Sequence, residues 1–228
     1  MHIPDGFVDL PTSVAFGAVA AGGVALALRG ARRELDDRTA PMVGLVAVFV
    51  FAVQMLNFPV AAGTSGHLLG GALAAVLVGP WTGVLCVTVV LVVQALLFAD
   101  GGITALGLNV TNMGLVTALV GWLVFTGLRR VLPRGRGSVV VATFVAALVS
   151  VPASALAFVG QFAVGGTTEV PLGTVTAAMV GVHVLVGIGE ALITALTVSG
   201  VLALRPDLVL GARDLLPSLQ LRGVPAPA

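Results

Sequence analysis

Hydrophobic residues fill most of this chain in long runs, and polar residues are confined to the short segments between the runs. The runs predict helices that are compatible with the hydrocarbon core of a membrane. Some runs are shorter than the ~20 residues that a perpendicular helix needs, so we expect their ends to extend into the flanking loops. The seven predicted crossings cover residues 11–28, 42–56, 67–78, 84–99, 108–128, 139–160 and 174–204.

The basic residues indicate how the predicted helices are oriented. All 11 are arginines, in three groups: Arg29, Arg32, Arg33 and Arg38; Arg129, Arg130, Arg134 and Arg136; and Arg205, Arg213 and Arg222. Such clusters mark the cytoplasmic side of a membrane protein. The pattern therefore predicts a bundle of seven transmembrane helices with the N-terminus outside and the C-terminus in the cytoplasm. The predicted outer segments are residues 1–10, 57–67, 99–107 and 161–173.

The composition supports a multi-pass protein of the cell membrane. Of the 228 residues, 58% are hydrophobic and 9% are charged, whereas a soluble domain carries about 25% charged residues. The start of the chain is no signal peptide, because it has no basic region and carries Asp5 and Asp9 instead. We predict one transmembrane domain over residues 1–204 and a partly disordered cytoplasmic tail over residues 205–228.

Met1 and His2 together offer a set of nitrogen donors for a metal ion. A free amine on Met1, the backbone nitrogen of His2 and the His2 imidazole close two fused chelate rings around one ion. The rings flatten the donor set, so one further donor in the plane completes a square, which suits Ni(II) or Cu(II) and also holds low-spin Co(II). Taken alone, an N-terminal Met-His pair is more often simply a frayed chain end.

His67 is the candidate for the fourth donor. It is expected to open a helix behind a glycine-containing loop, on the same side of the membrane as Met1 and His2. A hydroxyl of that loop, such as that of Ser65, can bond the second ring nitrogen of His67 and fix its tautomer. Three more polar residues are candidates for hydrogen bonds to the inserted N-terminal segment, although all three can equally be turn or cap residues. They are Asp100, Asn109 and Asn112.

His183 and Glu190 lie seven residues apart in the last apolar run and therefore share one helix face. An ionisable residue inside a membrane helix is a functional candidate by default. The alternative that we prefer is a buried, hydrogen-bonded polar pair that orders the bundle.

Parts of the sequence fit two other functions. The Gly63–Gly66 stretch with Ser65, together with His183 in a late helix, is similar to the serine–histidine dyad of rhomboid intramembrane proteases, but the other rhomboid features are missing. A stand-alone secondary metal transporter is a further alternative. The chain has no lysine and no phosphate-binding loop, so ATP hydrolysis would need a separate subunit.

Four blocks of sequence, in order along the chain, resemble the CbiM/NikM family of cobalt and nickel transport proteins. They are Met1–Phe7, Gly63–Gly71, Leu97–Gly107 and Gly187–Thr194. The resemblance extends from residue 1 to about residue 204.

The resemblance implies the substrate-capture subunit of an energy-coupling-factor transporter, which serves nickel uptake or the cobalt supply of cobalamin biosynthesis. It implies seven helices, an N-terminal segment tucked into an outward-facing cavity, and an ion held by nitrogens of Met1, His2 and His67. The implied partners are a transmembrane coupling component, a pair of cytoplasmic ATPases and often a small accessory membrane subunit. Co(II) or Ni(II) is then the transported substrate, and the chain itself is not an enzyme.

Overall fold

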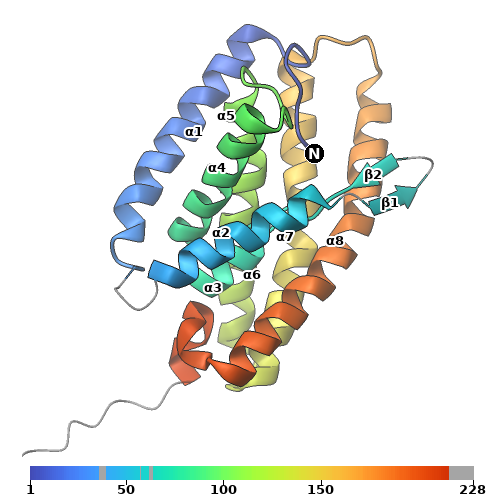
Figure 1. Ribbon diagram of the computed structural model, residues 1–228. Helices are drawn as coiled ribbons and strands as arrows, with labels where there is room; N and C mark the ends of the chain where they lie inside the picture. The colour runs from blue at the N-terminus through green and yellow to red at the C-terminus, as the bar shows by residue number, and fades with distance from the viewer. Residues whose placement is uncertain (36–39, 57, 62–63, 216–228) are drawn as a thin grey trace, which may run out of the picture.

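A bundle of long helices surrounds the N-terminal segment in the computed structural model (Figure 1). The structure describes residues 1–35, 40–56, 58–61 and 64–215, and only the backbone of residues 58–61 and 64–66. The elements in chain order are α1 (Leu10–Ala31), α2 (Ala40–Met55), β1 (Phe58–Ala61), β2 (Thr64–Gly66), α3 (Gly71–Val78), α4 (Pro80–Leu97), α5 (Leu106–Asn109), the π-helix η1 (Val110–Val116), α6 (Thr117–Val131), α7 (Arg136–Gly165), α8 (Leu172–Leu204), and the 3₁₀-helices η2 (Pro206–Leu208) and η3 (Leu210–Leu215).

Within the described part of the chain, five helical segments are long and apolar enough to cross a membrane: α1, α4, the continuous helix formed by α5, η1 and α6, α7 and α8. This confirms the predicted helical, multi-pass membrane protein. The predicted count of seven helices is not matched, because the described residues form eight α-helices. The helix α2 has 16 residues and α3 has only 8. At 1.5 Å per residue α3 rises about 12 Å, less than half of the hydrocarbon core.

The segment before α3 differs from its prediction. We expected His67 to open a helix, but α3 begins four residues later, at Gly71. Gly70 has a left-handed backbone with φ of 78°, and a Cβ atom there would lie 2.9 Å from a methyl group of Val50. Upstream, the predicted loop contains a short antiparallel hairpin of β1 and β2, in which Pro59 pairs with Ser65. His67 therefore lies on an extended strand-to-helix connection that reaches into the bundle.

The helices α7 and α8 form the most extensive contact in the bundle and pack closely at a proline. Pro152 lies inside α7 and has no N–H for the carbonyl of Leu148. At this level α8 carries Gly187, where a Cβ atom would lie 3.2 Å from that carbonyl oxygen. The absence of a side chain at Gly187 thus lets the two backbones approach where the hydrogen-bond ladder of α7 is interrupted.

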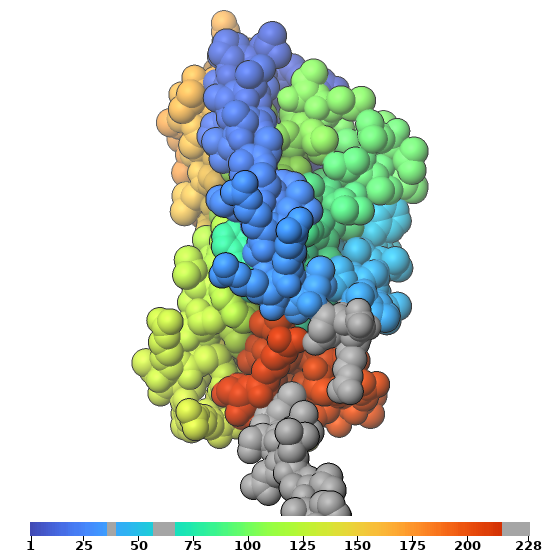
Figure 2. Space-filling model, turned by 90° about the vertical axis from the view of Figure 1, so that its left-hand side faces the viewer, coloured from blue at the N-terminus to red at the C-terminus, as the bar shows by residue number. Residues whose placement is uncertain are grey.

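The segment after α8 packs onto one end of the bundle. Val209 and Ala212 are fully buried, and Asp214 accepts a hydrogen bond of 2.7 Å from Arg129 at the end of α6. Figure 2 shows this segment, in red, beyond the end of the long α1 helix. The predicted tail at residues 205–228 therefore begins with packed structure, and residues 216–228 lie outside the described residues.

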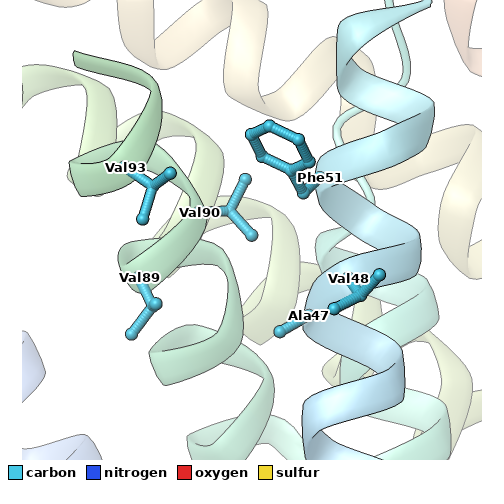
Figure 3. A pocket seen from close by; sticks show the side chains of 6 residues that line it. All are labelled: Ala47, Val48, Phe51, Val89, Val90 and Val93. Carbon is cyan, nitrogen blue, oxygen red and sulfur yellow. The ribbon is translucent and has the colours of Figure 1, made fainter. Parts of the chain in front are cut away.

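A hollow of about 220 Å³ lies between α2 and α4 (Figure 3). Its walls are hydrocarbon only: Ala47, Val48 and Phe51 from α2, and Val89, Val90 and Val93 from α4. With no polar atom among these side chains, the hollow has the chemistry of a lipid-facing groove and not of a metal site.

Candidate metal site

Residues 1–9 turn back from the start of α1 and run into the bundle. Asp9 caps α1 by accepting a hydrogen bond of 2.9 Å from the amide of Thr12. The amide of Asp9 donates to the carbonyl of Gly165 at 2.7 Å, and Val8 forms a bridge with Gly166 at the end of α7. The helix cap and the bridge together direct the preceding residues inward (Figure 1).

Ile3 is the anchor of this segment and is fully buried. Its amide donates to Oδ1 of Asn109 at 2.8 Å, and Nδ2 of Asn109 donates to the Ile3 carbonyl at 3.2 Å. The same carbonyl accepts a bond of 2.8 Å from the amide of Gly102. The side chain of Asn109 thus bonds both backbone groups of Ile3, as a β-strand partner would, and the hydrogen bonds for which Asn109 was a candidate are present.

The Met1 amine and the His67 ring meet inside the bundle. The amine nitrogen lies 3.0 Å from Nε2 of His67, whose side chain is buried. The other ring nitrogen, Nδ1, lies 2.9 Å from the carbonyl oxygen of Leu68. Since a carbonyl only accepts, Nδ1 carries the proton and Nε2 has its lone pair directed at the amine. Within the described residues, the partner of Nδ1 is therefore the backbone carbonyl of Leu68.

The His2 ring lies beside this contact, tilted against the ring of His67. Its ring centroid lies 4.9 Å from that of His67, with 40° between the ring planes. Nε2 of His2 is buried and has no hydrogen-bond partner among the described residues; a carboxylate oxygen of Asp100 is 3.6 Å away. Asp100 is therefore close enough for a charge interaction but too far for a direct hydrogen bond.

The Met1 side chain reaches further in, between α7 and η1. Ser154 donates to the Met1 sulfur at 3.0 Å and also lies 2.8 Å from the carbonyl oxygen of Asn112. The side chain of Asn112 donates to Gln161 at 2.7 Å, and within the described residues it forms no hydrogen bond to the inserted segment. The prediction for Asn112 thus needs correction, because its side chain ties η1 to α7. Ser154 was missed, and its only signal was a hydroxyl within an apolar run.

Burial makes the nitrogen donors poor bases. It lowers the pKa of the Met1 amine from 8.0 to about 6, with a smaller opposite effect from the charge of Asp100. Burial also lowers the pKa of His2 from 6.5 to about 4; the neighbouring amine lowers it further and Asp100 opposes the change. At neutral pH both groups are therefore largely unprotonated, the form in which nitrogen binds a metal.

His183 and Glu190 do not form the predicted polar pair. Nδ1 of His183 donates to the carbonyl of Met179 at 2.7 Å, whereas the Glu190 carboxylate accepts from the amides of Leu69 and Gly70 at 2.6 and 3.0 Å. Both side chains are buried in α8, but each has its own partner.

The side chain of Ser65 lies outside the described residues, so its proposed roles stay predictions. Among the described residues, no group of three or more His, Cys, Asp or Glu side chains is arranged to hold a metal ion. The candidate site differs from such a group because two of its donors, the Met1 amine and the His2 backbone nitrogen, belong to the main chain.

Comparison with known proteins identifies the family. The family model described as cobalt uptake substrate-specific transmembrane region, CbiM, matches residues 2–208. The chain belongs to the CbiM family. A relative from Haloquadratum walsbyi, provisionally named a metal transport protein, is 42% identical over 92% of this chain and 93% of its own length. One from Archaeoglobus fulgidus, provisionally named the fused nickel transport protein NikMN, is 40% identical over 92% of this chain and 68% of its own.

A crystal structure of a transition metal transporter superimposes on this CbiM-family chain with a TM-score of 0.79 and 30% identity. The match covers 89% of this chain and 93% of that one. The predicted membership of a metal-transport family of multi-pass membrane proteins is thereby confirmed. These relatives are named as transport proteins, which does not favour the alternative of an intramembrane protease.

Proposed function

We propose that this chain is the substrate-capture subunit of an ATP-driven cobalt or nickel uptake transporter. It takes Co(II) or Ni(II) from outside and holds the ion with four nitrogens: the Met1 amine, the backbone and ring nitrogens of His2, and Nε2 of His67. The family described as cobalt uptake and the relative named as a nickel transport protein support these two ions.

The observation that carries this proposal is the 3.0 Å separation between the Met1 amine and Nε2 of His67. The amine, amide and imidazole of a Met1–His2 chelate fill three successive corners of a square, so His67 enters the corner beside the amine. Two nitrogens at right angles on one ion, with bonds of about 2.0 to 2.1 Å, lie about 2.8 to 3.0 Å apart. The amine and His67 therefore already stand at the spacing of neighbouring ligands.

The placement of the charged residues supports entry from outside. The ends of α1, α6 and α8 and the start of α7, where the described arginine groups lie, are at the end of the bundle opposite the start of α1 (Figure 1). If arginines mark the cytoplasm, the N-terminal segment enters the bundle from the outer surface. The proposal has seven crossings when α2 is counted as one crossing and the extended connection from His67 together with α3 as another, beside the five long spans.

The proposed partners are a transmembrane coupling component, a pair of cytoplasmic ATPases and a small accessory membrane subunit. The sequence contains no nucleotide-binding loop, so ATP-driven uptake requires another chain that hydrolyses ATP. The name of the Archaeoglobus fulgidus relative describes a fused protein, which supports an arrangement with further modules.

The ligand set is tested by equilibrium dialysis of purified protein against Ni(II) and Co(II). We expect one ion per chain for the native protein, and loss of binding in His2→Ala and His67→Ala. His183→Ala is the matched control, because it removes a buried histidine that is outside the proposed ligand set. Full binding by His67→Ala would contradict the proposal.

The transport function is tested by uptake of both ions in cells that lack their own nickel and cobalt importers. Uptake should require the ATPase subunits and should disappear when their phosphate-binding lysines are replaced. Uptake that survives this change and follows an ion gradient would favour the secondary transporter.

A further inference from the structure

The backbone that follows His67 is held by side chains from two distant helices. The amides of Leu69 and Gly70 donate to the two oxygens of Glu190 on α8, at 2.6 and 3.0 Å. The carbonyl of Leu69 accepts a bond of 2.7 Å from Gln54 on α2. Glu190 is 1% exposed and Gln54 is 0% exposed, so these bonds are shielded from water.

A carboxylate in the interior of a membrane protein is costly unless donors surround it. For Glu190 the donors are the amide of Gly70, the N-cap residue of α3, and the amide of Leu69 just before it. Glu190 therefore fixes, from a neighbouring helix, the backbone that enters α3, and Gly70 supplies no side-chain cap of its own. Stabilisation of this helix start does not by itself account for the connection to His67.

One peptide group connects Glu190 to the His67 ring. The N–H of Leu69 donates to Glu190, and the C=O of Leu68, which belongs to the same peptide group, accepts from Nδ1 of His67 at 2.9 Å. A peptide group is planar and rigid. A carboxylate that fixes its N–H therefore also fixes the direction of its C=O, and with it the plane of the imidazole.

The same connection affects how strongly His67 donates electrons. Hydrogen bonds in a chain polarise one another in a low-dielectric interior. The negative charge of Glu190 makes the Leu68 carbonyl a stronger acceptor, which draws the proton on Nδ1 and makes Nε2 a better ligand. Metal-binding histidines are often supported by a carboxylate on the second ring nitrogen. Here a peptide group stands between the carboxylate and the ring.

We propose that Glu190 is a positioning residue for the metal ligand His67 and acts through the peptide group of Leu68 and Leu69. The proposal rests on the proposed function, since it assigns a role toward an ion bound at His67. Glu190 thereby connects α8, through one peptide group, to the His67 ring, whose other nitrogen lies next to the Met1 amine.

The test compares native protein, Glu190→Gln and the control Thr194→Val, all loaded with Ni(II). Glutamine keeps the volume of Glu190 but loses the charge and one of the two acceptors. Thr194 is also buried in α8, one turn further along. The readouts are the Ni(II) affinity by chelator competition, the energy of the ligand-field absorption band and the melting temperature.

We expect Glu190→Gln to weaken Ni(II) binding by about 10- to 100-fold, the usual effect of losing a partner of a metal ligand. The ligand-field band should move to lower energy, and Thr194→Val should leave both readouts unchanged. A lower melting temperature in Glu190→Gln with native affinity and an unshifted band would overturn the proposal and leave Glu190 with a structural role only, at the start of α3. A native chain that binds no Ni(II) would overturn the proposed function as well.

If Glu190→Gln does not fold, the native protein provides the measurement. Square-planar Ni(II) is diamagnetic, so the amide proton of Leu69 can be followed by NMR with and without the ion. A change in its shift that exceeds that of the Gly70 amide supports the connection through the peptide group, and an unchanged shift overturns it.

Discussion

Replacement of Asn109 by alanine tests whether the docked N-terminal segment is needed for binding. The side chain makes two buried hydrogen bonds to the backbone of Ile3, at 2.8 and 3.2 Å. Without them the buried N–H of Ile3 loses its partner, and the Ile3 carbonyl keeps the bond from the Gly102 amide. An unsatisfied buried group costs about 1 to 3 kcal/mol, and the lost second bond to the carbonyl adds to this cost. We therefore expect docking to weaken by about 2 to 4 kcal/mol.

Met1 and His2 can bind the ion together with His67 only when the N-terminal segment is docked. The free energy lost from docking should therefore reduce the affinity for Ni(II). At about 1.4 kcal/mol per tenfold change, the dissociation constant for Ni(II) should rise roughly 30- to 700-fold. Chelator competition on detergent-solubilised protein measures it. The control is Thr111→Val, because the Thr111 hydroxyl donates to the carbonyl of Gly107 one turn earlier in the same continuous helix. An Asn109→Ala protein that folds and binds within threefold of native would refute this reasoning.

Two further predictions concern the ligand's neighbourhood and the packing of the bundle. Asp100→Asn should weaken Ni(II) binding about tenfold in the chelator competition. When Nδ1 of His2 binds the ion, Nε2 keeps its proton, and the Asp100 carboxylate 3.6 Å away stabilises that protonated form. An unchanged affinity would show that Asp100 does not support the site. Gly107→Ala should lower the free energy of unfolding by about 1 to 3 kcal/mol in thermal melts, because the new Cβ would lie 2.5 Å from the Cα of Gly17 on α1. Gly127→Ala, with nothing within 4 Å, should be neutral or stabilising, and equal losses in both variants would contradict the packing argument.

The sequence predicts the parts of this protein that depend on local pattern. Long apolar runs predict membrane helices because hydrocarbon accepts no unpaired backbone, and five of the runs are long, apolar helices in the structure. The even number of crossings between arginine groups predicted that Met1 and His67 lie on the same side of the membrane. In the structure the Met1 amine lies 3.0 Å from Nε2 of His67. Their role as metal ligands stays a prediction.

The errors come from partners that are distant in sequence. The pattern after His67 favours a helix, but Glu190, over 100 residues away, takes the amides of Leu69 and Gly70, and α3 starts later. In the same way the side chain of Asn112 points to Gln161 instead of the N-terminal segment. No periodicity within a single run shows which of its polar residues meets which neighbour.

The most direct test of the central claim is to block the amine of Met1 without changing any side chain. Bound Ni and Co are quantified in the native chain, in a chain with a Gly-Ser extension ahead of Met1, and in a control with the same residues added at the C-terminus. Intact mass verifies the first residue of each. We predict one ion per chain in the native and control proteins and none in the extended one. Equal metal content in all three would contradict ligation by the amine and with it the proposed site.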